Sequence, residues 1–421
     1  MRKIAIDHMP LENNPLYSND FCSYYIFSRI MYPLFTFDGK KIVKNACKSI
    51  TIKKNKYVIK IKDNINFYNG RTVTVKDYYN SFVSVMGKMC YGKYLLENVK
   101  KIYIDNDQII IILKRKDLFF LDKLSYYSFS PFEENLTCGP YYVETIGKDI
   151  MILKKNIYYE DSKEIKSLEF VQYRRNDVRD FLNNKLDMTN ITTFPLKLIE
   201  KLKPEVHNSN LMFVLKFNSK LMSKKYRNVR RYILSAIDKE KLNHLLNDVY
   251  IVKNDFSLND EKYNYKSKVS KFNSVEKLTL GYTNYYPNKI IADELQRQFL
   301  DKKVNVELVQ YNLCEKNNCD IYIDIVFSPF FFKESFYLSK YFKIVNGKKY
   351  KILCNIYEQT KNKLIYKKIM KRCNSTANII PLLRSKYIYL RSSEMKKTNQ
   401  NKVNFYEMWA KWRKNTKFGA I

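Results

Sequence analysis

The sequence predicts an α/β protein in which two α/β lobes are separated by a mainly β insert. Strand, helix and strand patterns follow one another near residues 168–188 and again at 277–309, which is typical of parallel strands joined by a helix. Residues 48–113 instead carry short alternating strands joined by turns. A length of 421 residues with 45% hydrophobic side chains allows two or three domains with buried cores.

The first third is expected to contain two hairpins with a helix between them. Alternation of apolar and polar residues predicts strands at 48–53 and 57–62, joined at Asn55-Lys56, and a second hairpin at 101–113 around Asp105-Asn106-Asp107. Asn69-Gly70 indicates a turn. Thr74 followed by Asp77 indicates a capped helix start, since the carboxylate would lie near the positive N-terminus of the helix.

The remaining elements follow in chain order. Gly139-Pro140 is expected to begin a strand pair, 141–145 with 150–154. A strand at 168–171 and a helix at 176–183 come next, with a further strand beginning at Leu186. The second α/β pattern has strands at 277–282, 304–309 and 320–326, and a helix at 287–301. We expect the strands on either side of that helix to be parallel.

Composition narrows the function classes. The net charge of +34 first suggests nucleic acid, an acidic membrane surface or an acidic partner. The Lys and Arg residues are spread along the chain, however, and we interpret the charge mainly as a solvated basic surface. The eight cysteines lack the CxxC pairs of common zinc sites, and Cys314 and Cys319 are the closest pair. We therefore expect no cofactor, no metal site and no catalytic residues.

Several segments resemble a known family. Residues 63–82, Asp-Asn-Ile-Asn-Phe-Tyr-Asn-Gly-Arg-Thr-Val-Thr-Val-Lys-Asp-Tyr-Tyr-Asn-Ser-Phe, look like the signature of the family 5 extracellular solute-binding proteins, which serve peptide and nickel ABC importers. Further landmarks follow in the family's order, at residues 14–16, 30–35, 137–141, 182–187, 217–218, 228–239 and 405–409. The resemblance covers essentially the whole chain.

The resemblance implies a bilobal fold like that of class-II periplasmic binding proteins, with a β-rich domain inserted in the first lobe. Residues 1–36, 137–212 and 378–421 would form lobe I, residues 37–136 the insert, and residues 213–377 lobe II. The chain would cross between lobes near 211–217 and 377–381, and we expect hinges there.

The resemblance also implies a function, the capture of a small solute by hinge closure, with an oligopeptide or dipeptide as the expected ligand. Ligand-binding candidates are Asn14, Tyr17, Ser18, Tyr141, Asp324, Phe327 and Ser328. The family's amine-pairing Asp is missing by simple count, because its place falls near Ser328. Asp324 or Glu334 would substitute for it, and Lys333 or another Lys would replace a carboxylate-binding Arg.

Partners and location follow from the same resemblance. The partners would be a small-molecule or peptide ligand and, if the chain is exported, an ABC permease, with an anionic membrane surface as a further option and nucleic acid disfavoured. A monomer is expected. The family implies the extracytoplasmic face of a bacterial cell, yet Asp7 and His8 interrupt the N-terminus before any signal-like apolar run. A leaderless cytoplasmic sensor or partner-binding module with the same fold is the alternative, and binding to nucleic acid or an acidic surface through the +34 charge is another.

Overall fold

The computed structural model describes residues 1–18, 20–38, 41–159, 165–173, 176–256, 277–312, 318–330, 335–338 and 340–398. The chain forms two compact units. Unit 1 holds Met1–Ile191 with the segment from Ile388 onward, and unit 2 holds Thr192–Tyr387. The chain therefore changes unit at 191/192 and 387/388, whereas we expected lobe changes at 212/213 and 377/378. The three-part division of the lobes stays a prediction.

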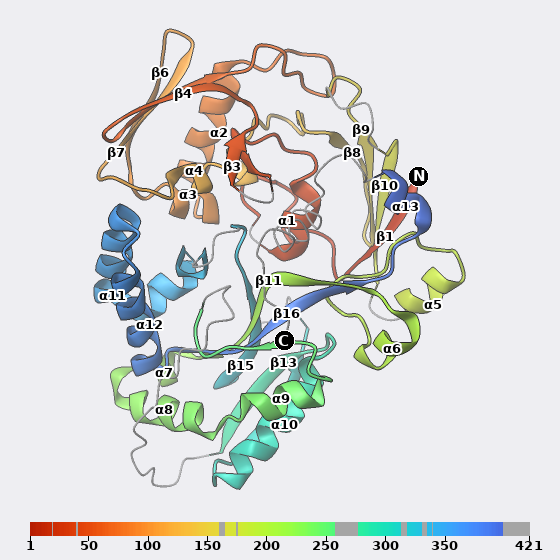
Figure 1. Ribbon diagram of the computed structural model, residues 1–421, viewed down its shortest axis with the longest axis vertical. Coiled ribbons are helices and arrows are strands. Elements are labelled where there is room, and N and C mark those ends of the chain that lie inside the picture. Colours follow the sequence, from red (N-terminus) through yellow and green to blue (C-terminus); the bar gives the residue numbers. More distant parts are fainter. Residues whose placement is uncertain are drawn as a thin grey trace, which may run out of the picture. The chain divides into compact units, whose positions relative to one another are not determined.

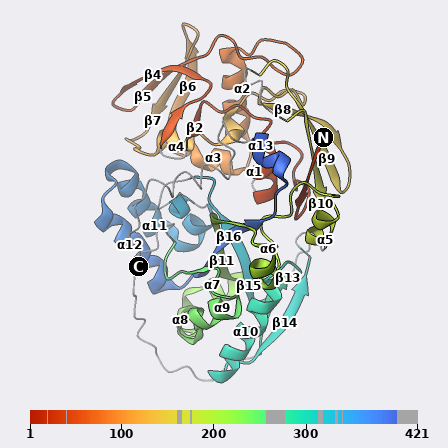
Figure 2. The same cartoon turned by 45° about the vertical axis from the view of Figure 1, so that its right-hand side comes forward.

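Within the described residues of unit 1, the strands form three sheets (Figure 1 and Figure 2). One four-stranded sheet has the order β1-β10-β9-β8, a second has the order β4-β5-β7-β6, and β2 pairs with β3. The elements of this unit are β1 (Arg2–Ile6), α1 (Phe21–Phe27), β2 (Phe35–Phe37), β3 (Ile42–Lys44), β4 (Cys47–Lys53), β5 (Lys56–Ile61), α2 (Val75–Gly87), α3 (Tyr91–Leu95), β6 (Val99–Asp105), β7 (Gln108–Leu113), α4 (Phe120–Lys123), β8 (Tyr141–Ile146), β9 (Ile150–Lys155), β10 (Ser167–Gln172), α5 (Asp177–Leu182) and α13 (Ser393–Thr398).

Unit 2 is built on a six-stranded sheet of order β12-β16-β11-β15-β13-β14. Strands β13 and β14 are parallel, as predicted for the strands on either side of a helix, and β15 also runs parallel to β13. The elements of this unit are α6 (Ile199–Leu202), β11 (Glu205–Phe217), α7 (Ser219–Met222), α8 (Arg227–Ala236), α9 (Lys239–Leu245), β12 (Ile251–Val252), β13 (Leu278–Thr283), α10 (Asn288–Asp301), β14 (Val306–Tyr311), β15 (Ile321–Phe327), α11 (Lys340–Thr360), α12 (Lys363–Thr376) and β16 (Ile379–Tyr389).

The two predicted hairpins are confirmed, although one turn lies one residue earlier than expected. The β4–β5 turn lies at Lys54-Asn55, one residue before its expected place, because Lys54 takes the left-handed backbone conformation (φ 52°). The β6–β7 turn has positive φ at both Asn106 and Asp107, the geometry that fits the twist of a two-residue hairpin. The strand expected to begin at Leu186 is reduced to isolated bridges of Met188 with Ile4 and Arg391.

The predicted start of α2 is confirmed as a capping box. The backbone N–H of Thr74 donates to Asp77 Oδ2 at 2.7 Å, and the N–H of Asp77 donates to Thr74 Oγ1 at 3.4 Å. The first bond satisfies the N–H of Thr74, and the second gives a side-chain acceptor to the N–H of Asp77, which also donates to Thr74 O at 3.1 Å. The apolar face of α2 buries Tyr78 and Phe82.

We expect Thr74→Ala to lower the free energy of unfolding by about 1 kcal/mol, because it removes the side-chain acceptor for the N–H of Asp77. Urea titration followed by circular dichroism measures the change. The control is Lys76→Ala, which lies exposed in the same first turn and should leave stability within about 0.5 kcal/mol of the parent. Equal effects of the two substitutions would contradict a capping role.

Candidate functional site

The first candidate group lies in the loop between β1 and α1 of unit 1. The Asn14 side chain accepts from the N–H of Leu16 at 2.9 Å, and its backbone oxygen accepts from the N–H groups of Tyr17 and Ser18. The loop is thereby folded on Asn14. Asn14 and Tyr17 keep part of their surface exposed, whereas Ser18 is buried.

The hydroxyl groups of this loop are bonded within unit 1. The Tyr17 hydroxyl lies 2.7 Å from Ser84 Oγ on α2, and the Ser18 hydroxyl lies 2.8 Å from Tyr127 Oη. The backbone oxygen of Ser18 also accepts from the hydroxyls of Tyr126 and Tyr127. Ser18 is thus held firmly in place, and Tyr17 is the better exposed of the two hydroxyl-bearing candidates.

Tyr141 begins β8 and is buried. Its N–H donates to Arg29 O at 3.1 Å, and the N–H of Gly139 donates to Ile30 O at 2.9 Å. The Asn156 side chain donates to Gly139 O at 3.0 Å. This turn therefore joins the end of α1 to the β8–β9 pair.

The second candidate group lies in unit 2, with Asp324 and Phe327 on β15 and Ser328 directly after it. Asp324 forms an ion pair with Lys216 on β11, and both side chains are partly exposed. The N–H of Ser328 donates to Asn210 O at 3.1 Å, and the backbone oxygen of Ser328 accepts from the Asn210 side-chain amide. Phe327 is half-buried beside Leu211 in the strand register, whereas Ser328 is buried. The alternatives Lys333 and Glu334 lie outside the described residues.

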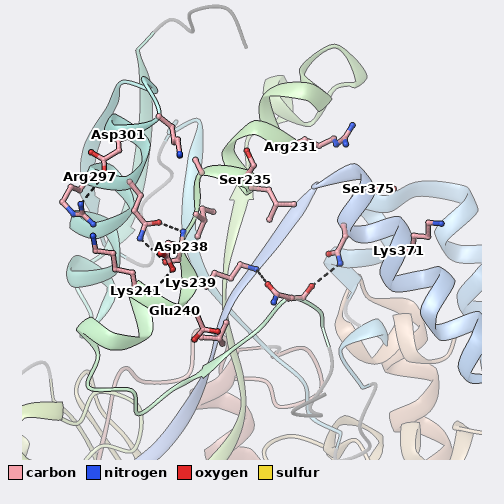
Figure 3. Close-up of a pocket in the computed structure, with 18 residues that line it drawn as sticks. Arg231, Ser235, Asp238, Lys239, Glu240, Lys241, Arg297, Asp301, Lys371 and Ser375 are labelled. Carbon is pink, nitrogen blue, oxygen red and sulfur yellow. Dashed lines mark hydrogen bonds and ion pairs between the residues drawn. The ribbon is translucent and has the colours of Figure 1, made fainter. Parts of the chain in front are cut away.

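Sequence analysis missed a cavity of ≈ 750 Å³ in unit 2 (Figure 3). Its lining is rich in charged side chains from α8, α9, α10 and α12 and from residues directly beside these helices. They include Arg231, Asp238, Lys239, Glu240, Lys241, Arg297, Asp301, Lys302 and Lys371. Part of the lining belongs to the landmark at 228–239, which we had used only as a mark of resemblance.

Lys239 is the buried cation of this cavity wall. Its Nζ donates to Lys253 O at 2.8 Å and to Asn254 Oδ1 at 3.1 Å. Burial lowers its pKa to about 7, while the nearby Asp255 raises it and Lys253 lowers it further. Lys253 and Asp255 form an ion pair of 3.5 Å in which both side chains are 2% exposed.

Arg230 is a second residue of the landmark at 228–239 whose contacts the structure shows. Its guanidinium donates to Leu221 O, to Thr376 O and, at 2.7 Å, to the side chain of Asn378. The side chain thereby joins α7 and α8 to the end of α12 and the start of β16. Burial, with a contribution from Arg227, lowers its pKa to about 10. We interpret Arg230 as a structural residue of unit 2.

The family of bacterial extracellular solute-binding proteins, family 5 middle, matches residues 41–289, more than half of the chain. The chain belongs to this family. The predicted resemblance is confirmed, and the family binds solutes rather than catalysing a reaction. No curated protein sequence matches the chain.

Solved structures confirm the predicted bilobal fold class of this family 5 solute-binding protein. A periplasmic oligopeptide-binding protein (OppAIV) of Borrelia burgdorferi aligns with a TM-score of 0.82 at 19% identity, over 93% of this chain and 95% of that one. NikZ of Campylobacter jejuni, in complex with Ni(L-His), aligns with a TM-score of 0.79 at 18% identity, over 93% and 94%. The murein tripeptide-binding protein MppA of Escherichia coli gives a TM-score of 0.78 at 15% identity, over 93% and 94%.

Within the part of the chain that the structure describes, every helix is too short or too polar to cross a membrane.

Proposed function

We propose that this family 5 protein is the receptor of an ABC importer and captures an oligopeptide by closure of its two units. The observation that supports the proposal is the family match, together with alignments over nearly the full length of peptide-binding relatives. Ligand contacts that exist only in the closed form would shift the equilibrium toward closure. A membrane permease, on the extracytoplasmic face, would then bind the closed form.

The ligand-binding candidates divide by exposure. Asn14, Tyr17, Asp324 and Phe327 retain surface with which to contact a ligand. Ser18, Tyr141 and Ser328 are buried and hydrogen-bonded, so their role in the proposal is to hold the neighbouring candidates in place.

Asp324 is our proposed partner for the amine of a peptide. It is the acidic candidate on the β15 segment, and a carboxylate paired with an ammonium forms a charge-assisted bond. Its present partner is Lys216, so a ligand amine would replace one ammonium group by another at the same carboxylate. The exchange would leave the carboxylate paired in both states.

We expect short peptides to raise the melting temperature in a thermal-shift screen, because a ligand at 100 times its Kd stabilises the folded state by about 2.7 kcal/mol. A panel of tri- to pentapeptides is compared with nickel–histidine chelates, and binding is confirmed by isothermal titration. If no peptide raises the melting temperature but the chelates do, the proposed ligand is a metal chelate and not a peptide. Indifference to the whole panel would contradict both.

The role of Asp324 is tested with peptides carrying a free or an acetylated N-terminus. The parent should prefer the free amine, and Asp324→Asn should abolish that preference. Asp105→Asn, at an exposed position of unit 1, is the matched control. A preference that survives in Asp324→Asn would remove Asp324 from the site without contradicting peptide binding itself.

A further inference from the structure

Three side chains of different chemistry meet near the start of unit 1, and the proposed peptide site does not use them. They are His8, which follows β1, Asp20, which is the N-cap of α1, and Cys22, in the first turn of α1. One donor atom from each lies within 4.8 Å of the others. His8 Nε2 is 4.0 Å from Asp20 Oδ1.

The imidazole of His8 is oriented for coordination. Its Nδ1 lies 2.8 Å from Met9 O, and a carbonyl oxygen only accepts, so Nδ1 carries the proton. In the neutral ring Nε2 then carries the lone pair, and this atom lies 4.0 Å from Asp20 Oδ1. Histidine ligands of metals commonly donate their second ring N–H to a carbonyl or carboxylate in this way.

The other two donors are also held in place. The carboxylate of Asp20 accepts from the N–H of Ser23 at 2.8 Å and from the Ser23 hydroxyl, which fixes its plane at the start of α1. The Cys22 sulfur is buried, and the carboxylates of Asp7 and Asp20 lie near it. Burial and these carboxylates raise the pKa of the thiol well above its ordinary value, so a thiolate at this position needs the positive charge of a bound cation.

We propose that His8, Asp20 and Cys22 form a binding site for a divalent late first-row cation, with Zn²⁺ as the best-fitting ion. Sulfur and imidazole donors favour zinc over magnesium or calcium. Bond lengths of about 2.0–2.3 Å place tetrahedral nitrogen, oxygen and sulfur ligands about 3.3–3.6 Å apart, so the three donors need to close by about 1.5 Å or less. Binding forms an S–Zn bond and releases the thiol proton of Cys22 to solvent.

Three protein ligands leave a fourth coordination position. Structural zinc sites commonly use four protein ligands, whereas a three-ligand site keeps one position for water or another donor. His8 and Asp20 are 16% and 15% exposed, so solvent reaches two of the three ligands. The site is thus accessible to a cation in solution and does not depend on the proposed peptide function.

Co²⁺ replaces Zn²⁺ and reports its ligands by colour, which makes it the first probe. The full chain, freed of metal with a chelator, is titrated with Co²⁺ and then with Zn²⁺. We expect one equivalent of Co²⁺ to give a thiolate-to-metal charge-transfer band, and Zn²⁺ to displace it. Absence of this band in the parent protein would overturn the proposal and leave His8, Asp20 and Cys22 as polar neighbours that bind no metal.

Variants assign the ligands. Cys22→Ser should abolish the band, and His8→Gln and Asp20→Asn should each weaken Zn²⁺ binding at least tenfold by isothermal titration. Asp20→Asn keeps an oxygen for the cap bond to Ser23, so the helix start is preserved. Cys47→Ser, at a buried thiol of β4, is the control and should leave the band unchanged.

The test remains decisive if Cys22→Ser fails to fold. In that case Zn²⁺ should protect Cys22 of the parent from alkylation, as mapped by mass spectrometry, and should not do so in His8→Gln. A band that persists in Cys22→Ser, or equal Zn²⁺ affinity in all variants, would overturn the assignment.

Discussion

Gly139→Ala is expected to destabilise unit 1 by about 3 kcal/mol, because a methyl group at this position has no space. An added Cβ would lie 2.4 Å from Ile30 C, 2.6 Å from Ile30 O and 2.7 Å from Met31 N. These are backbone atoms of the segment that follows α1, and they cannot rotate away as a side chain can. The N–H of Gly139 also donates to Ile30 O, so a shift that relieved the clash would disturb this hydrogen bond.

Gly87→Ala is the matched control for that substitution. Gly87 is the last residue of α2, and a Cβ there would meet nothing within 4 Å. Alanine is the better helix former, so this change should be neutral or stabilising by up to about 1 kcal/mol. Hydrogen exchange at Gly139 and Tyr141, with urea titration, measures the two effects. Equal stability of both variants would show that the backbone between α1 and β8 moves at little cost to accommodate the added methyl group.

Local signals account for most of what the sequence predicted correctly. The capping box at Thr74 and the hairpin turn at Asn106-Asp107 depend on residues within a few positions of one another. The strand, helix and strand pattern of β13, α10 and β14 has a clear hydrophobic period, and its parallel pairing follows from the connection. Such features need no knowledge of distant segments.

The central strands of unit 2 could not be predicted in the same way. Strand β11 includes the polar run Asn208, Ser209 and Asn210, which breaks any apolar alternation and for which we predicted no strand. All three are buried, and their partners lie far along the chain. The Lys386 Nζ donates to Asn208, Ser209 donates to Ser385 O, and Asn210 contacts the Tyr387 hydroxyl. Their burial depends on tertiary partners that a local pattern does not contain.

The candidate site residues likewise depend on contacts between segments that are distant in the sequence. The sequence placed Ser328 near the missing amine partner, but its bonds to Asn210 tie it to β11 across 118 positions. The grouping of His8, Asp20 and Cys22 was missed because we looked for regular spacings of cysteines and histidines along the chain. It arises when the chain reverses between β1 and α1, and mixed ligands of this kind have no fixed sequence spacing.

Lys239→Met is expected to remove a large pH dependence from the stability of unit 2. The folded pKa of Lys239 is lowered to about 7 from 10.5, mainly by burial. Between these two values the unfolded chain binds a proton that the folded chain does not. The free energy of unfolding contributed by this group therefore rises with pH, by about 1.4 kcal/mol per pH unit.

The comparison of parent and variant isolates this effect. Relative to Lys239→Met, the parent should gain up to about 5 kcal/mol between pH 7 and 10.5, and the difference should be constant below pH 7. Loss of the Lys239 bonds to Lys253 O and Asn254 offsets all values by a constant. Urea titrations at several pH values measure the slope, and Lys241→Met, at an exposed neighbour, should show none. If the difference in unfolding free energy between the parent and Lys239→Met does not change with pH, water reaches the Lys239 ammonium group through the adjoining cavity. Hydration alone would return its pKa to the ordinary value.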